Sequence, residues 1–138
     1  MFSRIMVPVD LAHVDKLGKS LKCAADLARN YDVPVIYVGV TAAVPSALAH
    51  RPAEYSERLA AFANGQAEAE GIATGHHMIT SHDPRIDLDP ALLKAAKEIQ
   101  ADLIVMASHL PNVTDYIWPS NGGTIASHSP VTVMVVRD

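Results

Sequence analysis

The sequence predicts an α/β fold: a doubly wound, five-stranded parallel sheet with helices on both faces. Short apolar runs alternate with segments of helical spacing along the chain, and this alternation is typical of βαβ units joined by right-handed crossovers. Several of the runs are apolar at almost every position, as expected of strands buried on both faces of a parallel sheet. At 138 residues the chain is expected to form a single domain, residues 1–138, around one core.

The first half of the chain predicts two strands and two helices. An apolar run predicts the first strand over 2–9, and apolar residues that recur every three or four positions predict a helix over 13–30. The run 35–40 predicts the second strand. Residues 41–52 contain two prolines and are expected to form a loop. The Ala- and Glu-rich stretch 53–70 predicts the second helix.

The third strand is expected over 74–81, where polar interruptions are typical of a strand at a sheet edge. A loop is expected over 82–89. Asp89 then predicts the N-cap of a helix that begins at Pro90, because a capping carboxylate followed by proline is a common helix start. The uninterrupted run 103–106 predicts a buried fourth strand.

The end of the chain is expected to form a long loop, a short helix and a last strand. The loop covers the polar stretch 108–121, and the helix follows it to about His128. Residues 131–136 read VTVMVV, which is rich in β-branched residues and predicts the fifth strand.

Composition argues against two classes of partner. The formal net charge is −4 and no cluster of Lys and Arg is present, whereas nucleic-acid binding needs clustered cations. The first apolar run, 5–9, is far too short to act as a signal peptide or to span a membrane. We therefore expect a cytoplasmic protein that binds neither nucleic acid nor membrane.

The histidines do not predict a metal site. His76 and His77 are neighbours in a predicted strand, so their side chains point to opposite faces and cannot chelate one ion together. His82 and Asp83 follow at a spacing that fits no zinc pattern. No metal ligand is therefore assigned.

Ligands of open parallel sheets bind beyond the carboxyl ends of the strands, where the strand order reverses. Asp10 follows the first predicted strand, and Ala107, Ser108 and His109 follow the fourth. A carboxylate at that place can hydrogen-bond a ligand's amino group or ribose, or hold a metal. The alternative, that Asp10 only caps the helix after it, is about equally supported by position alone.

Three segments resemble the universal stress protein family. The segment 5–10 (IMVPVD) is similar to the family's first strand, 103–109 (LIVMASH) to its fourth strand and turn, and 128–137 (HSPVTVMVVR) to its last helix end and strand. The tract 107–116, continued by Ser120 and Asn121, resembles the F/G-type branch in particular. This resemblance implies a sheet of order 3-2-1-4-5.

The resemblance also implies a site for ATP, with or without magnesium. Adenine would lie against the first two strands, and the phosphates in a loop of form G-x2-G-x9-G-[ST], whose glycines let backbone N–H groups approach phosphate oxygens. The residues implied are Pro8, Val9, Asp10, Val40, Ala107, Ser108, His109, Leu110, Ser120 and Asn121.

The phosphate loop departs from that pattern. Its first two glycine positions fall on Ala107 and Leu110, where Leu110 replaces an Arg common in the F/G-type branch. Strict counting places the third glycine on Ser120, but alignment on the branch's Gly-Ser-Asn places it on Pro119, which we prefer. Proline lacks the N–H donor and fixes φ near about −65°. The backbone N–H groups of Ser120 and Asn121 remain a candidate anion site.

His109 lies within the same loop and has two interpretations. Its imidazole could contact a phosphate. It could equally make a structural hydrogen bond within the loop.

The leading functional hypothesis is a stress-response protein that binds ATP and changes its partner binding in response. Leu110 and Pro119 favour an alternative, a dimeric interaction module that has lost nucleotide binding. A third hypothesis is a weak ATPase or phosphotransferase. Against it, the sequence contains no Walker lysine, no obvious pair of nucleophile and general base, and no dense carboxylate cluster.

The last strand predicts a homodimer. In the order 3-2-1-4-5 it lies at a sheet edge, and an uncharged, β-branched edge invites pairing with another strand. Two copies could pair these strands antiparallel about a twofold axis, through Val131, Val133 and Val135. The resemblance implies the same contact. The alternative is that the chain's own loop, near 116–118, covers the edge.

Overall fold

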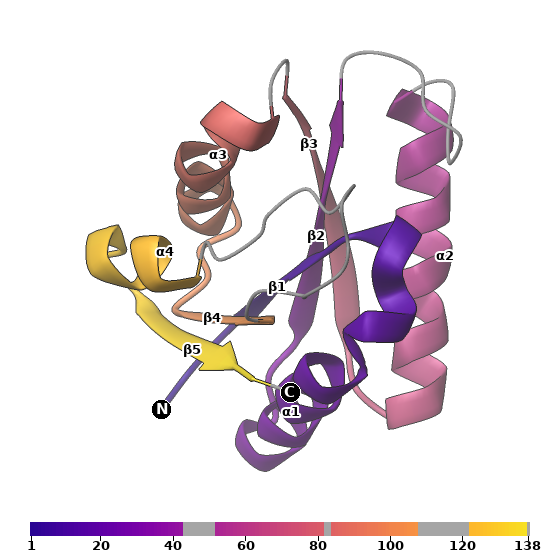
Figure 1. The fold of residues 1–138 in the computed structure, drawn as a ribbon. Coiled ribbons are helices and arrows are strands. Elements are labelled where there is room, and N and C mark those ends of the chain that lie inside the picture. The colour runs from indigo at the N-terminus through magenta and orange to yellow at the C-terminus, as the bar shows by residue number, and fades with distance from the viewer. Residues whose placement is uncertain (43–51, 82–83, 108–121, 138) are drawn as a thin grey trace.

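Five parallel strands form one sheet in the order β3-β2-β1-β4-β5 (Figure 1). The computed structural model describes residues 1–42, 52–81, 84–107 and 122–137. The strands are β1 (Ile5–Val9), β2 (Val35–Ala42), β3 (Thr74–Ser81), β4 (Leu103–Ala107) and β5 (Thr132–Val136). The predicted fold class and strand order are therefore confirmed.

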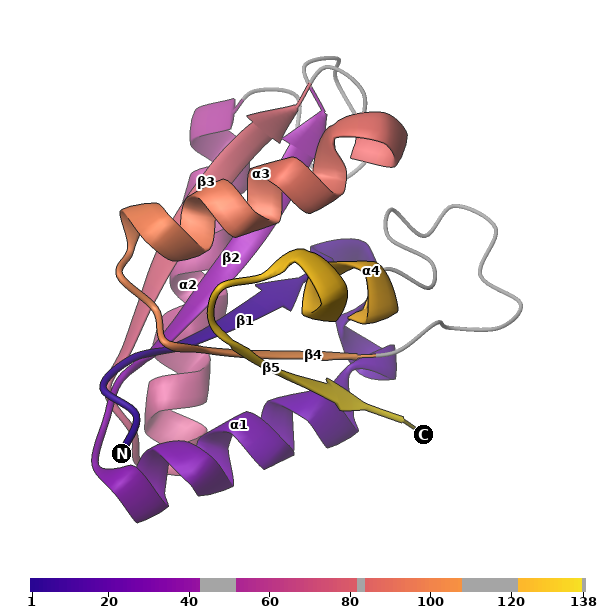
Figure 2. The same ribbon diagram turned by 90° about the vertical axis from the view of Figure 1, so that its left-hand side faces the viewer.

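Helices cover both faces of this sheet. They are α1 (Gly18–Tyr31), α2 (Pro52–Glu70), α3 (Pro84–Glu98) and α4 (Gly122–His128), with a short 3-10 helix, η1 (Leu11–Lys16), after β1. The helices α1 and α2 lie on one face, and α3 and α4 lie on the other (Figures 1 and 2). This division follows from right-handed crossovers, because the chain moves outward from β1 in one direction to β3 and in the other from β4 to β5.

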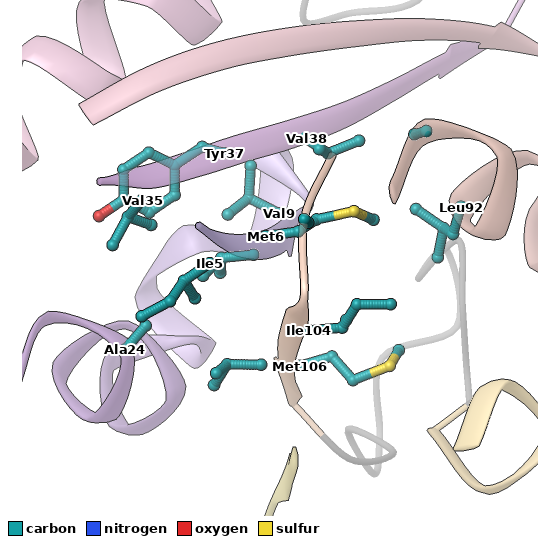
Figure 3. Close-up of a cluster of buried hydrophobic side chains, with 14 of the residues drawn as sticks. Ile5, Met6, Val9, Ala24, Val35, Tyr37, Val38, Leu92, Ile104 and Met106 are labelled. Atoms are coloured by element: carbon teal, nitrogen blue, oxygen red, sulfur yellow. The ribbon is translucent and has the colours of Figure 1, made fainter. Parts of the chain in front are cut away.

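The two central strands carry the core. Every residue of β1 is buried, and so are the first four residues of β4. Ala24 of α1 and Leu92 of α3 approach these strands from opposite sides (Figure 3). The sequences of β1 and β4 are uniformly hydrophobic because neither face of a central parallel strand is exposed to water.

The start of α3 was predicted wrongly. The helix begins at Pro84 and contains Pro90, whereas the sequence favoured a loop up to Asp89 and a helix from Pro90. Pro84 supplies the preset backbone angle that suits a first helical residue. The helix then tolerates Pro90 at a cost of about 3 kcal/mol, which burial of Leu92 and Ala95 beyond it offsets.

The first helix also differs from the prediction. A single helix was expected from residue 13, but α1 begins only at Gly18, after η1. His13 has non-helical backbone angles within η1, and the Leu17 N–H bonds the Val14 carbonyl over 3.0 Å. The Asp10 side chain accepts from the Ala12 N–H and so starts η1 immediately after β1.

Tyr37 of β2 buries an unpaired hydroxyl. Its side chain is fully buried, its ring meets Phe62 of α2 edge-on with centroids 5.1 Å apart, and its Oη has no hydrogen-bond partner in the described residues. Burial, with a smaller effect of the nearby Glu70 charge, raises the pKa of Tyr37 to about 12. The phenol is therefore neutral at pH 7. Burial removes its oxygen from water, and no hydrogen bond within the described residues compensates for this desolvation.

We expect Tyr37→Phe to stabilise the protein by about 1–3 kcal/mol, because it removes a desolvated polar group and keeps the ring. Urea unfolding measures this change. Tyr31→Phe is the matched control, since Tyr31 is only half-buried and should change stability by less than about 0.5 kcal/mol. A destabilised Tyr37→Phe protein would show that the hydroxyl has a partner, such as an internal water.

Candidate functional site

The strand order reverses between β1 and β4, and the two strands diverge there. They pair only at Ile5 with Leu103 and at Met6 with Ile104. Beyond these pairs β1 and β4 separate toward their carboxyl ends (Figure 2). In doubly wound folds this is the place where a ligand crevice forms.

Asp10 follows β1 directly at this point, and its residue is only 3% exposed. Its Oδ1 accepts a hydrogen bond from the Ala12 N–H over 3.1 Å, and its Oδ2 lies 2.9 Å from Nδ1 of His13. The capping role that the sequence allowed is therefore present. A carboxylate offers about four acceptor positions, so these two bonds leave room for a ligand donor.

His13 is a site residue that the sequence interpretation missed. Because an ionised carboxylate can only accept, the contact assigns the proton of His13 to Nδ1. The half-buried imidazole thereby fixes the orientation of the Asp10 side chain. The available signal was an acid followed by histidine three residues later, directly after a strand.

Tyr55 of α2 is a second missed residue. It is 4% exposed and lies on Gly39 of β2, where an added Cβ would come within 2.8 Å of the tyrosine Cε1 and Oη. Burial raises the pKa of Tyr55, and the negative charge of Asp10 raises that pKa further. Tyr55 thus remains a neutral phenol whose pKa is affected by the charge of Asp10.

The remaining predicted residues fall into two groups. Pro8 and Val9 are buried in β1 and pair with Val38 and Gly39, which places Val40 of β2 level with Asp10. Ala107 ends β4, is half-buried and pairs with Val136. Outside the described residues lie the other members of the predicted phosphate loop: Ser108, His109, Leu110, Pro119, Ser120 and Asn121.

Two further expectations concern metals and membranes. Within residues 1–42, 52–81, 84–107 and 122–137, no three His, Cys, Asp or Glu side chains are grouped so that they could hold a metal ion. The Nε2 atom of His77 instead lies 3.2 Å from Oε2 of Glu98. None of the helices in the described part of the chain is long and apolar enough to cross a membrane.

The chain is thus an α/β protein with a doubly wound parallel sheet and a buried carboxylate at the switch point of its strand order, which is where ligand crevices form in folds of this class. The chain belongs to the universal stress protein family, whose model matches residues 1–137. A relative from Salmonella typhimurium, named Universal stress protein G, is 25% identical over 143 residues, covering 99% of this chain and 100% of the relative. Its name agrees with the resemblance to the F/G-type branch.

Solved structures of the family share the fold. A universal stress protein from Archaeoglobus fulgidus has a TM-score of 0.69 at 20% identity, with 98% of each chain covered. A structure of that organism's universal stress protein in complex with dAMP has a TM-score of 0.65 at 18% identity, with 96% of each chain covered. A universal stress protein in complex with cAMP has a TM-score of 0.70 at 18% identity, covering 98% of this chain and 97% of that one.

We expect Gly39→Ala to destabilise the fold by about 1–3 kcal/mol, because its Cβ collides with the Tyr55 ring. Chemical denaturation measures the effect. In a double-mutant cycle, Tyr55→Ala should remove at least about 0.5 kcal/mol of that cost, since the two sites are in contact. Gly18→Ala is the matched control, because nothing lies within 4 Å of a Cβ added there. An additive cycle would contradict the assigned packing.

Proposed function

We propose that this chain is a stress-response protein that binds an adenine nucleotide, ATP in the cell, at the switch point of its sheet. The observation that carries the proposal is the buried, oriented carboxylate of Asp10 at the end of β1, level with Val40 of β2. Family members of the same fold that were solved with cAMP and dAMP support an adenine nucleotide as the ligand class.

In this proposal each end of the nucleotide has its own residues. The adenine ring packs on Pro8, Val9 and Val40, and Asp10 accepts a hydrogen bond from the adenine amino group or the ribose. The phosphates lie beside Ala107, Ser108, His109 and Leu110, with the N–H groups of Ser120 and Asn121 as donors, and magnesium as a further participant with ATP. Leu110 and Pro119 weaken only the phosphate end, so base and ribose supply most of the affinity.

The output of binding is a change in partner contacts in the cytoplasm, with residues 1–138 acting as one domain. A homodimer through β5 is part of the proposal. This strand pairs with β4 alone among the described strands, and Met134 on it is 37% exposed. An apolar edge of this kind is stabilised when a second strand satisfies its backbone groups and covers its side chains.

One alternative has a specific observation in its favour. Both oxygens of Asp10 are already engaged by Ala12 and His13, and Leu110 and Pro119 remove phosphate-binding features. A dimeric interaction module without a nucleotide would retain this geometry. Calorimetry of the unmodified protein with ATP and AMP, with and without magnesium, separates the two: no heat at millimolar nucleotide, together with a dimer by light scattering, would favour the module.

We expect Asp10→Ala to weaken ATP and AMP binding by between about tenfold and 150-fold, because one charge-assisted hydrogen bond contributes about 1.5–3 kcal/mol. Titration calorimetry measures the affinities. Circular dichroism should show a folded protein, since loss of the cap costs only about 1 kcal/mol. Asp15→Ala, an exposed acid on the same 3-10 helix, is the control and should leave affinity unchanged. Equal affinity in a folded Asp10→Ala protein would remove Asp10 from the site.

We expect Val133→Lys and Met134→Lys to shift the protein from dimer toward monomer, because each places a charge in the paired edge. Light scattering after size-exclusion chromatography gives the mass. The exposed position of Met134 keeps the test informative even where Val133→Lys does not fold. Asn64→Lys on α2, also exposed, is the control. A parent protein that is already monomeric at micromolar concentration would refute the dimer.

A further inference from the structure

A groove of about 580 Å³ lies between the last two turns of α3 and the connection from α4 to β5. Both helices lie on the same face of the sheet (Figure 2). Its residue Val131 directly precedes the pair Leu103–Thr132, at the amino ends of β4 and β5. The groove is therefore at the opposite end of the strands from Asp10, which follows the carboxyl end of β1, and is separate from the nucleotide site proposed above.

The floor of this groove is apolar and its far wall is fixed. Leu93 and Val131 line it and also pack against the hydrophobic core. Pro130 restricts the backbone of the wall. The Ser129 Oγ accepts the Val131 N–H over 3.0 Å and donates to the Val131 carbonyl over 3.1 Å. Because the backbone of this wall is already held in place, ligand binding would cost little conformational entropy there.

The rim of the groove is cationic. Its lining includes Lys94 and Lys97 and, among the residues that the structure describes, no carboxylate, although the chain has 15 acidic against 11 basic residues. The Lys94 side chain is 77% exposed, and its Nζ lies 3.8 Å from Oε1 of Glu98. The other oxygen of Glu98 is 3.2 Å from His77. An exposed ion pair of that length is weak, so Lys94 can turn to a ligand anion.

We propose that this groove binds a small amphiphilic carboxylate, with its aliphatic chain on Leu93 and Val131 and its head group between Lys94 and Lys97. The volume falls within the range of about 300–1,000 Å³ that is usual for small-molecule sites. A protein partner would need about 800 Å² of contact on its side, and the groove alone does not offer such an area. The lysines supply the charge complement for a single anionic head.

The test compares three probes of equal chain length: octanoate, 1-octanol and octylammonium. Methyl resonances of Leu93 and Val131 report binding in the groove, and titration gives the affinities. We expect octanoate to bind most tightly and octylammonium least. Lys94→Ala/Lys97→Ala should weaken octanoate about fivefold to tenfold and leave octanol unchanged, since exposed charge pairs contribute little each. Glu98→Gln should strengthen octanoate slightly.

Lys16→Ala/Lys19→Ala, which removes two exposed lysines outside the groove lining, is the control and should not change octanoate affinity. Lysines near a helix end also interact favourably with its dipole. If the groove variant loses stability in urea but binds octanoate as the parent does, the lysines serve only the helix and the proposal fails. It fails equally if octanol binds as tightly as octanoate, or if Asp10→Ala alters octanoate binding.

Discussion

The burial of β1 and β4 on both faces is the constraint on which the rest of the structure depends. Each fully buried aliphatic side chain there contributes about 1.5–3 kcal/mol, but only if helices cover both sides of the sheet. Coverage from both sides requires the chain to wind outward from the centre in two directions. The reversal between β1 and β4 is the result, so the core that stabilises the fold also creates the place where a ligand can enter.

Asp10 shows how a charge can exist so close to this core. An unpaired buried carboxylate would be strongly unfavourable, but the chain turns into η1 at once and supplies the Ala12 N–H, while His13 covers the second oxygen. The same carboxylate helps to keep Tyr55 neutral. The polar groups at the end of β1 are therefore oriented before any ligand arrives, and a ligand donor needs only the acceptor positions that remain.

The sequence predicted those features that depend on local pattern. The central strands β1 and β4 follow from uniform apolar runs, and the place of Asp10 follows from its position after such a run. The start of α3 could not be predicted, because Pro84 and Pro90 both suit a first helical position and only packing decides between them. His13 and Tyr55 were missed for a different reason. The contact of His13 with Asp10 depends on an irregular 3-10 turn, and the contact of Tyr55 with Gly39 depends on how α2 packs over the preceding strand β2.

The strand β5 connects all the regions for which binding is proposed. Its five residues pair with β4 from Leu103–Thr132 to Ala107–Val136, so it begins beside the α3 groove and ends beside Ala107, the first residue of the proposed phosphate loop. Its other edge, which pairs with no described strand, is the surface proposed for the dimer. A rigid pair of strands such as β4 and β5 couples two binding sites only if it can adopt two different conformations. Ligands at its two ends would affect each other only if each favours a different position of β5 or a different state of the dimer, and the effect would then be equal in both directions. Measuring the affinity of one ligand in the presence of the other tests for such coupling. It does not assign the coupling to β5 alone, because α4 (Gly122–His128) also runs from the end of the proposed phosphate loop to His128 in the groove lining.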